Sequence, residues 1–391
     1  MITKLMRNNL LLKGLLFFFI ISLMGLSTSL NYQKLLTSLF MPFLLLLVIC
    51  KNGFKLSFLK NKSLKNHFLI LVLSSILLFQ AIQIEIGISN LIQLVGVLIG
   101  GVIVVESIKY NRELLPWILF FFVIGFYVSV FYMFKNITSN TDIASQYLDR
   151  SVYDLNANKY SYYSLLANFA LFFLIELKKR RILIILSIFT TLLAIYVSFY
   201  TASRSGMLFT AVPAVIYWMF IFEISTSSYL KFLKNTFVFI AIIFISQKVY
   251  DIYSNSYLKK RVEYGAYQQD GRVSLANDAL NVFIDHPFIG VGPAQFAFYG
   301  DYQRGSYSHN SFLEAATNLG IIGLALVIIL FFKPLLHSLK IKNKGLKKVS
   351  MMFFLIFILY NIFYVFYWSL IEMMFFFIVT EIYYLDKSNF K

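Results

Sequence analysis

Long apolar stretches alternate with short polar segments along most of this chain. Examples are Leu15 to Leu26, Trp117 to Val130 and Ile321 to Phe332. With their small and weakly polar neighbours, such stretches reach the roughly 20 residues that a helix needs to cross a hydrocarbon core. Because backbone polar groups in lipid must bond to one another, each stretch is expected to be a helix. The runs are too continuous for the alternating pattern of an outer-membrane barrel.

The pattern predicts an all-α polytopic membrane protein, a single membrane domain over residues 1–391 with about twelve spans. The loops between most of the spans are short, and one long polar loop lies at residues 251–310. The expected limits of the spans are 11–28, 35–50, 67–86, 88–105, 115–135, 161–177, 182–200, 206–224, 235–250, 311–335, 350–368 and 371–385.

Composition agrees with a membrane protein, since 59% of the residues are hydrophobic and 14% are charged. The net charge of +17 is explained without a nucleic-acid partner, because basic residues accumulate in the cytoplasmic loops of membrane proteins. With the N-terminus inside, the cytoplasmic segments and adjoining span ends hold 24 of the 35 Lys and Arg, and the other side holds 11. Both termini are then predicted to be cytoplasmic, and the loop 251–310 to be extracytoplasmic.

That loop of about sixty residues is too long for a plain connector. Leu275, Ala279, Val282 and Phe283 recur at helical spacing and predict an amphipathic helix over residues 272–284. Asp270 is the expected cap of this helix, and the run Gly290-Val291-Gly292-Pro293 signals a turn. We therefore expect short helices within the loop.

The loop ends at the start of the tenth span, where Ser311 and Glu314 fit a capping box. This places His309 just outside a helix N-terminus at the membrane surface. A neighbouring helix N-terminus favours the neutral imidazole, which is the form that a general base needs. His309 is therefore the candidate base; the alternative is that it is simply a polar residue beside a helix cap.

Several basic residues lie on the predicted outer side, against the topological rule. Arg204 lies in the tight connection Ser203 to Gly206, and Arg272 lies near the start of the loop helix. Guanidinium groups bind two phosphate oxygens at once, so these two arginines predict a phosphate-bearing, lipid-linked ligand. The alternative is that they are solvated or snorkelling side chains. The further candidate substrate-binding residues are Lys260, Arg261, Arg304, Asn310 and Tyr302.

Other chemistry is not indicated. The one cysteine, Cys50, lies in an apolar stretch, and no Walker loop, Asp-x-Asp or His/Cys metal pattern occurs. We therefore expect neither a metal nor a cofactor.

Taken in order, these motifs resemble those of the O-antigen ligase and O-antigen polymerase family. The resemblance covers about residues 195 to 335, and the first five spans carry no motif that matches. It is carried by Ser203-Arg204-Ser205-Gly206, Gly271-Arg272, Asp285-His286-Pro287-Phe288-Ile289-Gly290-Val291-Gly292-Pro293, Ser308-His309-Asn310-Ser311-Phe312-Leu313-Glu314 and Gly320-Ile321-Ile322-Gly323.

The resemblance implies a glycosyltransferase of the GT-C type in the bacterial cytoplasmic membrane, with its active site on the extracytoplasmic side. Such enzymes take undecaprenyl-diphosphate-linked oligosaccharides as donors and need no metal. By position, Arg204 and Arg272 would hold the donor diphosphate, and His309 would take the proton of the attacking hydroxyl. Chain-length regulator and flippase proteins are expected partners.

Three functions remain open. The first is a polymerase that transfers the growing glycan to the next lipid-linked repeat unit. The second is a ligase that uses lipid A-core or a protein as acceptor. The third is a transporter or flippase of the same lipid-linked glycan, which should show related halves and mid-membrane polar residues. The concentration of charge in an external loop favours an enzyme.

Overall fold

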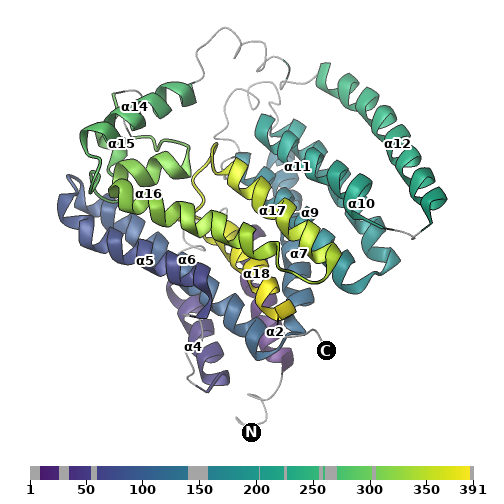
Figure 1. Cartoon of the computed structure of the whole chain (residues 1–391), viewed down its shortest axis with the longest axis horizontal. Helices are drawn as coiled ribbons and strands as arrows, with labels where there is room; N and C mark the ends of the chain where they lie inside the picture. The colour runs from purple at the N-terminus through teal and green to yellow at the C-terminus, as the bar shows by residue number, and fades with distance from the viewer. Residues whose placement is uncertain are drawn as a thin grey trace.

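The computed structural model describes residues 9–25, 35–53, 60–139, 157–201, 203–223, 227–254, 259, 271–301 and 305–387. Every element in these ranges is a helix (Figure 1). The first half of the chain forms α2 (Asn9–Gly25), η1 (Leu36–Phe40), α4 (Met41–Lys51), α5 (Lys62–Ile76), η3 (Leu77–Gln80), α6 (Ile84–Tyr110), α7 (Leu114–Ser139), α9 (Ala157–Lys178) and α10 (Arg181–Tyr200). The second half forms α11 (Arg204–Ile216), η5 (Tyr217–Ile221), α12 (Ser228–Ser254), α14 (Gly271–Asp285), α15 (Phe296–Tyr299), α16 (Ser311–Ser338), α17 (Lys344–Tyr360) and α18 (Leu370–Lys387).

Membrane-spanning helices account for much of the described chain. Within it, six helices are long and apolar enough to cross a bilayer, and three shorter apolar helices accompany them. The chain is therefore an all-helical, multi-pass membrane protein, although the expected number of twelve spans is not confirmed. The six are Lys62–Gln80, Ile84–Tyr110, Leu114–Lys135, Asn158–Lys178, Arg181–Ser198 and Ser311–Ser338.

Helix α9 lies at the centre of the bundle and packs against α7, α10, α11 and α17. In its apolar window 89% of the residues are buried, against 33% in the window at Arg181–Ser198. Buried polar groups also link α9 to its neighbours: Thr191 Oγ1 donates to Asn168 Oδ1 at 2.8 Å, and Ser164 Oγ lies 3.2 Å from Thr210 Oγ1. Such bonds between helices satisfy polar side chains that water cannot reach.

The break between α5–η3 and α6 falls at Ala81 to Gln83, about five residues before the expected boundary. Gly87 is inside α6 instead, where a Cβ would lie 2.6 Å from Leu78 Cδ1. Gln295 fixes the break, since its Oε1 accepts from the Gln83 N–H at 2.9 Å and its Nε2 donates to the Gln83 carbonyl at 3.1 Å. A tertiary contact therefore sets this boundary.

The expected span 350–368 is wrong in its bounds. Helix α17 begins at Lys344 and ends at Tyr360, and the apolar residues 361–369 are irregular. Asn361 ends the helix: its Nδ2 donates to the Phe357 carbonyl at 2.7 Å, and its own carbonyl accepts from the Ser311 N–H at 2.8 Å. The aromatic residues of 361–369 thus pack beside the N-terminus of α16.

Helices α14 and α15 cover the N-terminal half of α16 (Figure 1). The expected helix 272–284 is confirmed as α14, and its apolar residues Leu275, Ala279 and Val282 are buried. These side chains form a small separate core with Val291 and Phe296. The expected cap Asp270 lies outside the described residues.

Candidate functional site

The connection that carries Arg204 is held against the start of α9. Ser203 caps α11, because its Oγ accepts from the Gly206 N–H at 3.2 Å and donates to Asn158 Oδ1 at 3.3 Å. A Cβ at Gly206 would lie 2.1 Å from Ser161 Oγ, so only glycine permits this approach. Arg204 is the first residue of α11, and its side chain lies outside what the structure describes.

The turn after α14 crosses a break in α16. Gly320 has φ 66° and ψ −164° inside α16, which frees the carbonyls of the preceding turn. The N–H groups of Val291 and Gly292 donate to the Thr317 and Asn318 carbonyls, each at 2.9 Å. The predicted turn at Gly290 to Pro293 thus replaces the helical hydrogen bonds that the break removes.

Gly290 and Gly320 make this crossing sterically feasible. Both have φ 66°, and a Cβ on Gly290 would lie 2.5 Å from the Thr317 carbonyl oxygen. A Cβ on Gly320 would lie 2.2 Å from the Phe288 carbonyl oxygen. The loop that follows α14 is therefore seated directly on the backbone of α16.

A chain of buried hydrogen bonds continues from this crossing to the candidate base. Asn318 Oδ1 accepts from the Phe296 N–H at 2.9 Å, and Asn318 Nδ2 donates to Glu314 Oε1 at 2.7 Å. Glu314 Oε2 in turn accepts from the Ser308 N–H at 2.7 Å. Glu314 is 1% exposed. It therefore ties the segment immediately before His309 to α16.

The capping box expected at Ser311 and Glu314 is corrected by these contacts. The N-cap is Asn310, whose Oδ1 accepts from the N–H groups of Phe312 and Leu313 at 2.9 and 3.1 Å. Ser311 instead donates its hydroxyl hydrogen to Asn361 Oδ1. The side-chain oxygen of Asn310 therefore has a structural role in the folded chain.

His309 lies immediately before this cap, as the sequence predicts. Its backbone has φ 56°, the left-handed region that residues other than glycine seldom adopt. The side chain is half-buried, and its ring centroid lies 4.1 Å from that of Tyr307. Its surroundings therefore hold the imidazole beside an aromatic surface at the mouth of α16.

Aromatic side chains enclose Tyr307. Its ring lies 6.0 Å from that of Tyr364 and 6.3 Å from that of Trp368, both nearly perpendicular. Burial and the nearby Glu314 carboxylate raise the pKa of Tyr307 to about 12. Its hydroxyl is thus protonated at neutral pH and able to donate a hydrogen bond.

Arg272 reaches the same place from α14. Its guanidinium interacts electrostatically with the hydroxyls of both Tyr307 and Tyr360. Ser205, which adjoins Arg204, lies close to the Tyr360 hydroxyl, although that hydroxyl forms no hydrogen bond with the described residues. Segments that are far apart in the sequence, at 204–205, 272, 307–309 and 360, therefore converge.

The remaining candidates Lys260, Arg261, Tyr302 and Arg304 lie outside the described residues. Sequence reasoning missed Tyr360, Tyr364 and Trp368, because residues 350–368 read as one more apolar span. The signal available in the sequence was Asn361, a polar residue within that expected span. Across the described parts of the chain, no group of three His, Cys, Asp or Glu side chains is placed to hold a metal ion.

Comparison with protein families bears on these residues. Residues 189–328 match the family model described as O-antigen ligase. This region of the chain is similar to the O-antigen ligase family. The matched O-antigen ligase region begins in α10, ends in α16 and holds Arg204, Arg272 and His309. Tyr360, Tyr364 and Trp368 lie beyond its end. No curated protein matches the chain.

Proposed function

We propose that this chain is a glycosyltransferase of the GT-C type that polymerises lipid-linked oligosaccharide repeat units. It transfers the growing glycan from undecaprenyl diphosphate to a terminal sugar hydroxyl of the next lipid-linked unit. The observation that carries the proposal is the approach of Arg272 to the Tyr307–His309 segment within a region that matches the O-antigen ligase family. That family acts on glycans in membranes.

In the proposed reaction, the acceptor hydroxyl attacks the anomeric carbon of the donor glycan from the face opposite the diphosphate. The new glycosidic C–O bond forms as the C–O bond to the diphosphate breaks, so the anomeric configuration inverts. His309 takes the proton of the hydroxyl. Arg204 and Arg272 bind the departing diphosphate and stabilise the negative charge that grows on it. The proposed reaction uses no metal.

The aromatic surface beside His309 suits the acceptor sugar. The ring of Tyr307 lies 4.1 Å from the imidazole, and the rings of Tyr364 and Trp368 lie 6.0 and 6.3 Å from that of Tyr307. Sugar C–H faces pack favourably on such aromatic rings. In the proposal, Tyr307 stacks on the acceptor sugar and holds its hydroxyl toward His309.

The proposal also places the protein in the bacterial cytoplasmic membrane. Both termini are cytoplasmic in it, and the loop 251–310 and His309 are extracytoplasmic. Flippase and chain-length regulator proteins are the proposed partners. Reporter fusions at residue 259 and at the C-terminus test this arrangement, since a cytoplasmic loop would contradict both the topology and the mechanism.

The proposed activity is tested with the purified full chain in lipid nanodiscs, supplied with undecaprenyl-diphosphate-linked repeat units. We expect a ladder of longer lipid-linked glycans, formed at the same rate with and without EDTA. Single-repeat products alone, with no ladder, would contradict the polymerase.

The ligase is the second candidate, and the description of the matched family favours it. The same preparation is therefore supplied with a preformed lipid-linked glycan and lipid A-core. Transfer to lipid A-core without extension of the lipid-linked chain supports the ligase. Movement of the labelled lipid across the bilayer without any transfer supports the transporter.

A further inference from the structure

A cavity of about 700 Å³ lies between the C-terminal ends of α9 and η5 and the N-terminal ends of α10 and α17. It is at the opposite end of α9 and α17 from the candidate site. Tyr360 lies sixteen positions after Lys344 in α17, a distance of about 24 Å along the helix axis at 1.5 Å per residue. The positive-inside pattern predicts that this end is cytoplasmic. The cavity is thus separate from the site around His309.

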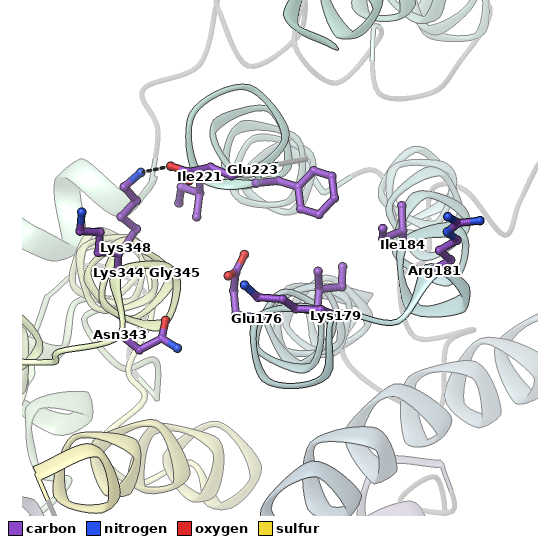
Figure 2. Close-up of a pocket in the computed structure, with 12 residues that line it drawn as sticks. Glu176, Lys179, Arg181, Ile184, Ile221, Glu223, Asn343, Lys344, Gly345 and Lys348 are labelled. Atoms are coloured by element: carbon purple, nitrogen blue, oxygen red, sulfur yellow. Dashed lines mark hydrogen bonds and ion pairs between the residues drawn. The ribbon is translucent and has the colours of Figure 1, made fainter. Parts of the chain in front are cut away.

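Cationic side chains dominate the charged lining of the cavity (Figure 2). It includes two acids, Glu176 and Glu223, and four basic residues, so its charged groups carry a net charge of +2 (four minus two). Lys348 Nζ lies 3.4 Å from Glu223 Oε1 and balances that acid. The four basic residues are Lys179, Arg181, Lys344 and Lys348.

Glu176 is already held by its neighbours. Tyr217 donates its hydroxyl hydrogen to Glu176 Oε1 at 3.1 Å, and a Cβ at Gly345 would lie 1.9 Å from Glu176 Oε2. The carboxylate therefore lies against the first turn of α17, where the helix dipole stabilises it. Lys179 and Lys348 also act electrostatically on this carboxylate. The four basic residues still exceed the two acids by two, so the cavity can accept an anion from outside the protein.

Lys179 supports a binding role for the cavity. It follows α9 with φ 48°, in the left-handed region where glycine or asparagine is usual after a helix. Figure 2 shows its side chain pointing into the cavity toward Glu176. A lysine that retains this costly backbone conformation, with its ammonium group in a cavity, is the kind of strained residue that clusters at ligand sites.

The other walls of the cavity are apolar. The apolar side chains that line it are Ile175, Ile184, Ile221 and Phe222. A soluble anion gains little from such walls, whereas the headgroup and upper acyl chain of a lipid would match both the cations and the apolar side chains. Basic pockets between membrane helices on the cytoplasmic side recognise anionic headgroups in this way.

We infer that this cavity binds a phosphate-bearing anion, and that its source is the headgroup of an anionic membrane lipid. The inference does not depend on the proposed glycan transfer, because it concerns a different end of the helical bundle.

The test measures binding of phosphatidylglycerol to the purified full chain by native mass spectrometry, with phosphatidylcholine, which is zwitterionic and carries no net charge, as the comparison. The test variant is Lys179→Asn/Lys344→Gln, in which asparagine retains the left-handed backbone conformation. The control variant is Lys340→Gln/Lys342→Gln, which removes two exposed charges nearby that do not line the cavity. A second arm adds glycerol 3-phosphate as the soluble source of the same chemistry.

The parent and the control should bind phosphatidylglycerol more tightly than phosphatidylcholine. The affinity of the test variant for phosphatidylglycerol should be roughly 30-fold lower than that of the parent, since each cation removed accounts for about fivefold in affinity. Failure of glycerol 3-phosphate to compete supports the lipid source, and binding of glycerol 3-phosphate alone overturns it. Equal affinity of test variant and parent overturns the site.

If the variant does not fold, photolabelling of the parent with a photoactivatable phosphatidylglycerol decides instead. Labelling of residues 175–184 supports the site, and labelling only elsewhere overturns it.

Discussion

The carboxylate of Glu314 accepts a hydrogen bond from the backbone N–H of Ser308 at 2.7 Å, from inside the first turns of α16. Its other oxygen accepts from Asn318 Nδ2, and Asn318 Oδ1 is occupied by the Phe296 N–H. These hydrogen bonds fix the orientation of both the Glu314 carboxylate and the Asn318 amide. A fully satisfied buried network of this kind holds one conformation of the segment that carries Tyr307 and His309.

Replacing Glu314 by glutamine breaks one of these bonds. The new amide can accept from Ser308, but its NH2 group would then face the NH2 group of Asn318, whose rotation would cost the bond to Phe296. We expect kcat of the glycan transfer to fall about 10-fold to 100-fold, since misplacement of a reacting group by about 1 Å has this effect. The KM for the donor should change much less. Steady-state kinetics on Glu314→Gln measure both constants.

The control for this variant is Glu113→Gln, an exposed acid that should leave kcat unchanged. If Glu314→Gln raises only KM, the residue acts on binding and not on the position of His309.

The second prediction concerns His309 itself. His309→Asn removes the imidazole but tolerates φ 56°, so the loop keeps its shape. Loss of a general base should lower kcat by about 10²-fold to 10⁴-fold. Donor binding, measured with the lipid-linked oligosaccharide in the absence of acceptor, should remain within about twofold. A variant that turns over as fast as the parent excludes His309 as the base.

Arg272 gives the third prediction, because its guanidinium can bind two oxygens of a diphosphate through a planar fork of N–H groups, which an ammonium lacks. We expect Arg272→Lys to weaken transfer by about 10-fold and Arg272→Gln by about 100-fold, as charge-assisted bonds are removed stepwise. Arg180→Gln, an exposed change at the other end of α9, is the matched control. Equal activity of all three variants would place the diphosphate elsewhere.

The crossing of Gly290 and Gly320 makes a prediction about stability. An alanine at either position must adopt a left-handed conformation, at a cost of about 1–2 kcal/mol. It must also displace backbone atoms that lie 2.2 to 2.5 Å from its Cβ. We expect both variants to unfold at clearly lower temperature than the parent in detergent, measured by thermal denaturation. Gly14→Ala, whose Cβ would meet nothing within 4 Å, should be neutral or up to about 1 kcal/mol more stable.

The parts of this arrangement that the sequence could predict are those set by residues close together along the chain. Local signals identified the loop helix α14, the turn at Gly290 and the position of His309 beside a helix N-terminus. Each of these rests on residues within one or two turns of one another. The cap itself was misassigned by one residue, because Asn310 and Ser311 are both good caps and only the bond of Ser311 to Asn361 decides between them.

Long-range contacts escaped prediction for the same reason. Gln295 fixes the start of α6 across 212 positions of sequence, and no periodicity records such a pair. The aromatic residues Tyr360, Tyr364 and Trp368 have the composition of a membrane span. Only the packing of residues 361–369 beside α16 shows that Tyr364 and Trp368 lie around Tyr307.

The last prediction concerns Tyr307 and separates the contribution of its aromatic ring from that of its hydroxyl. Because its pKa is raised to about 12, the hydroxyl stays protonated below about pH 10 and does not act as a base. If the ring packs on the acceptor sugar, Tyr307→Phe should keep most of the activity, whereas Tyr307→Ala should raise the acceptor KM by about 10-fold, as stacking contributes about 0.5–1.5 kcal/mol beyond burial.

The contrast between these two variants must appear in KM and not in kcat, because the imidazole of His309 is retained in both. Tyr299→Ala is the matched control, since that tyrosine lies in α15 and packs against His286 at a ring distance of 5.6 Å, away from His309. If Tyr307→Phe were as impaired as Tyr307→Ala, the hydroxyl and its interaction with the Tyr364 hydroxyl would be what matters. The aromatic surface would then hold His309 in place, and the acceptor sugar would bind elsewhere.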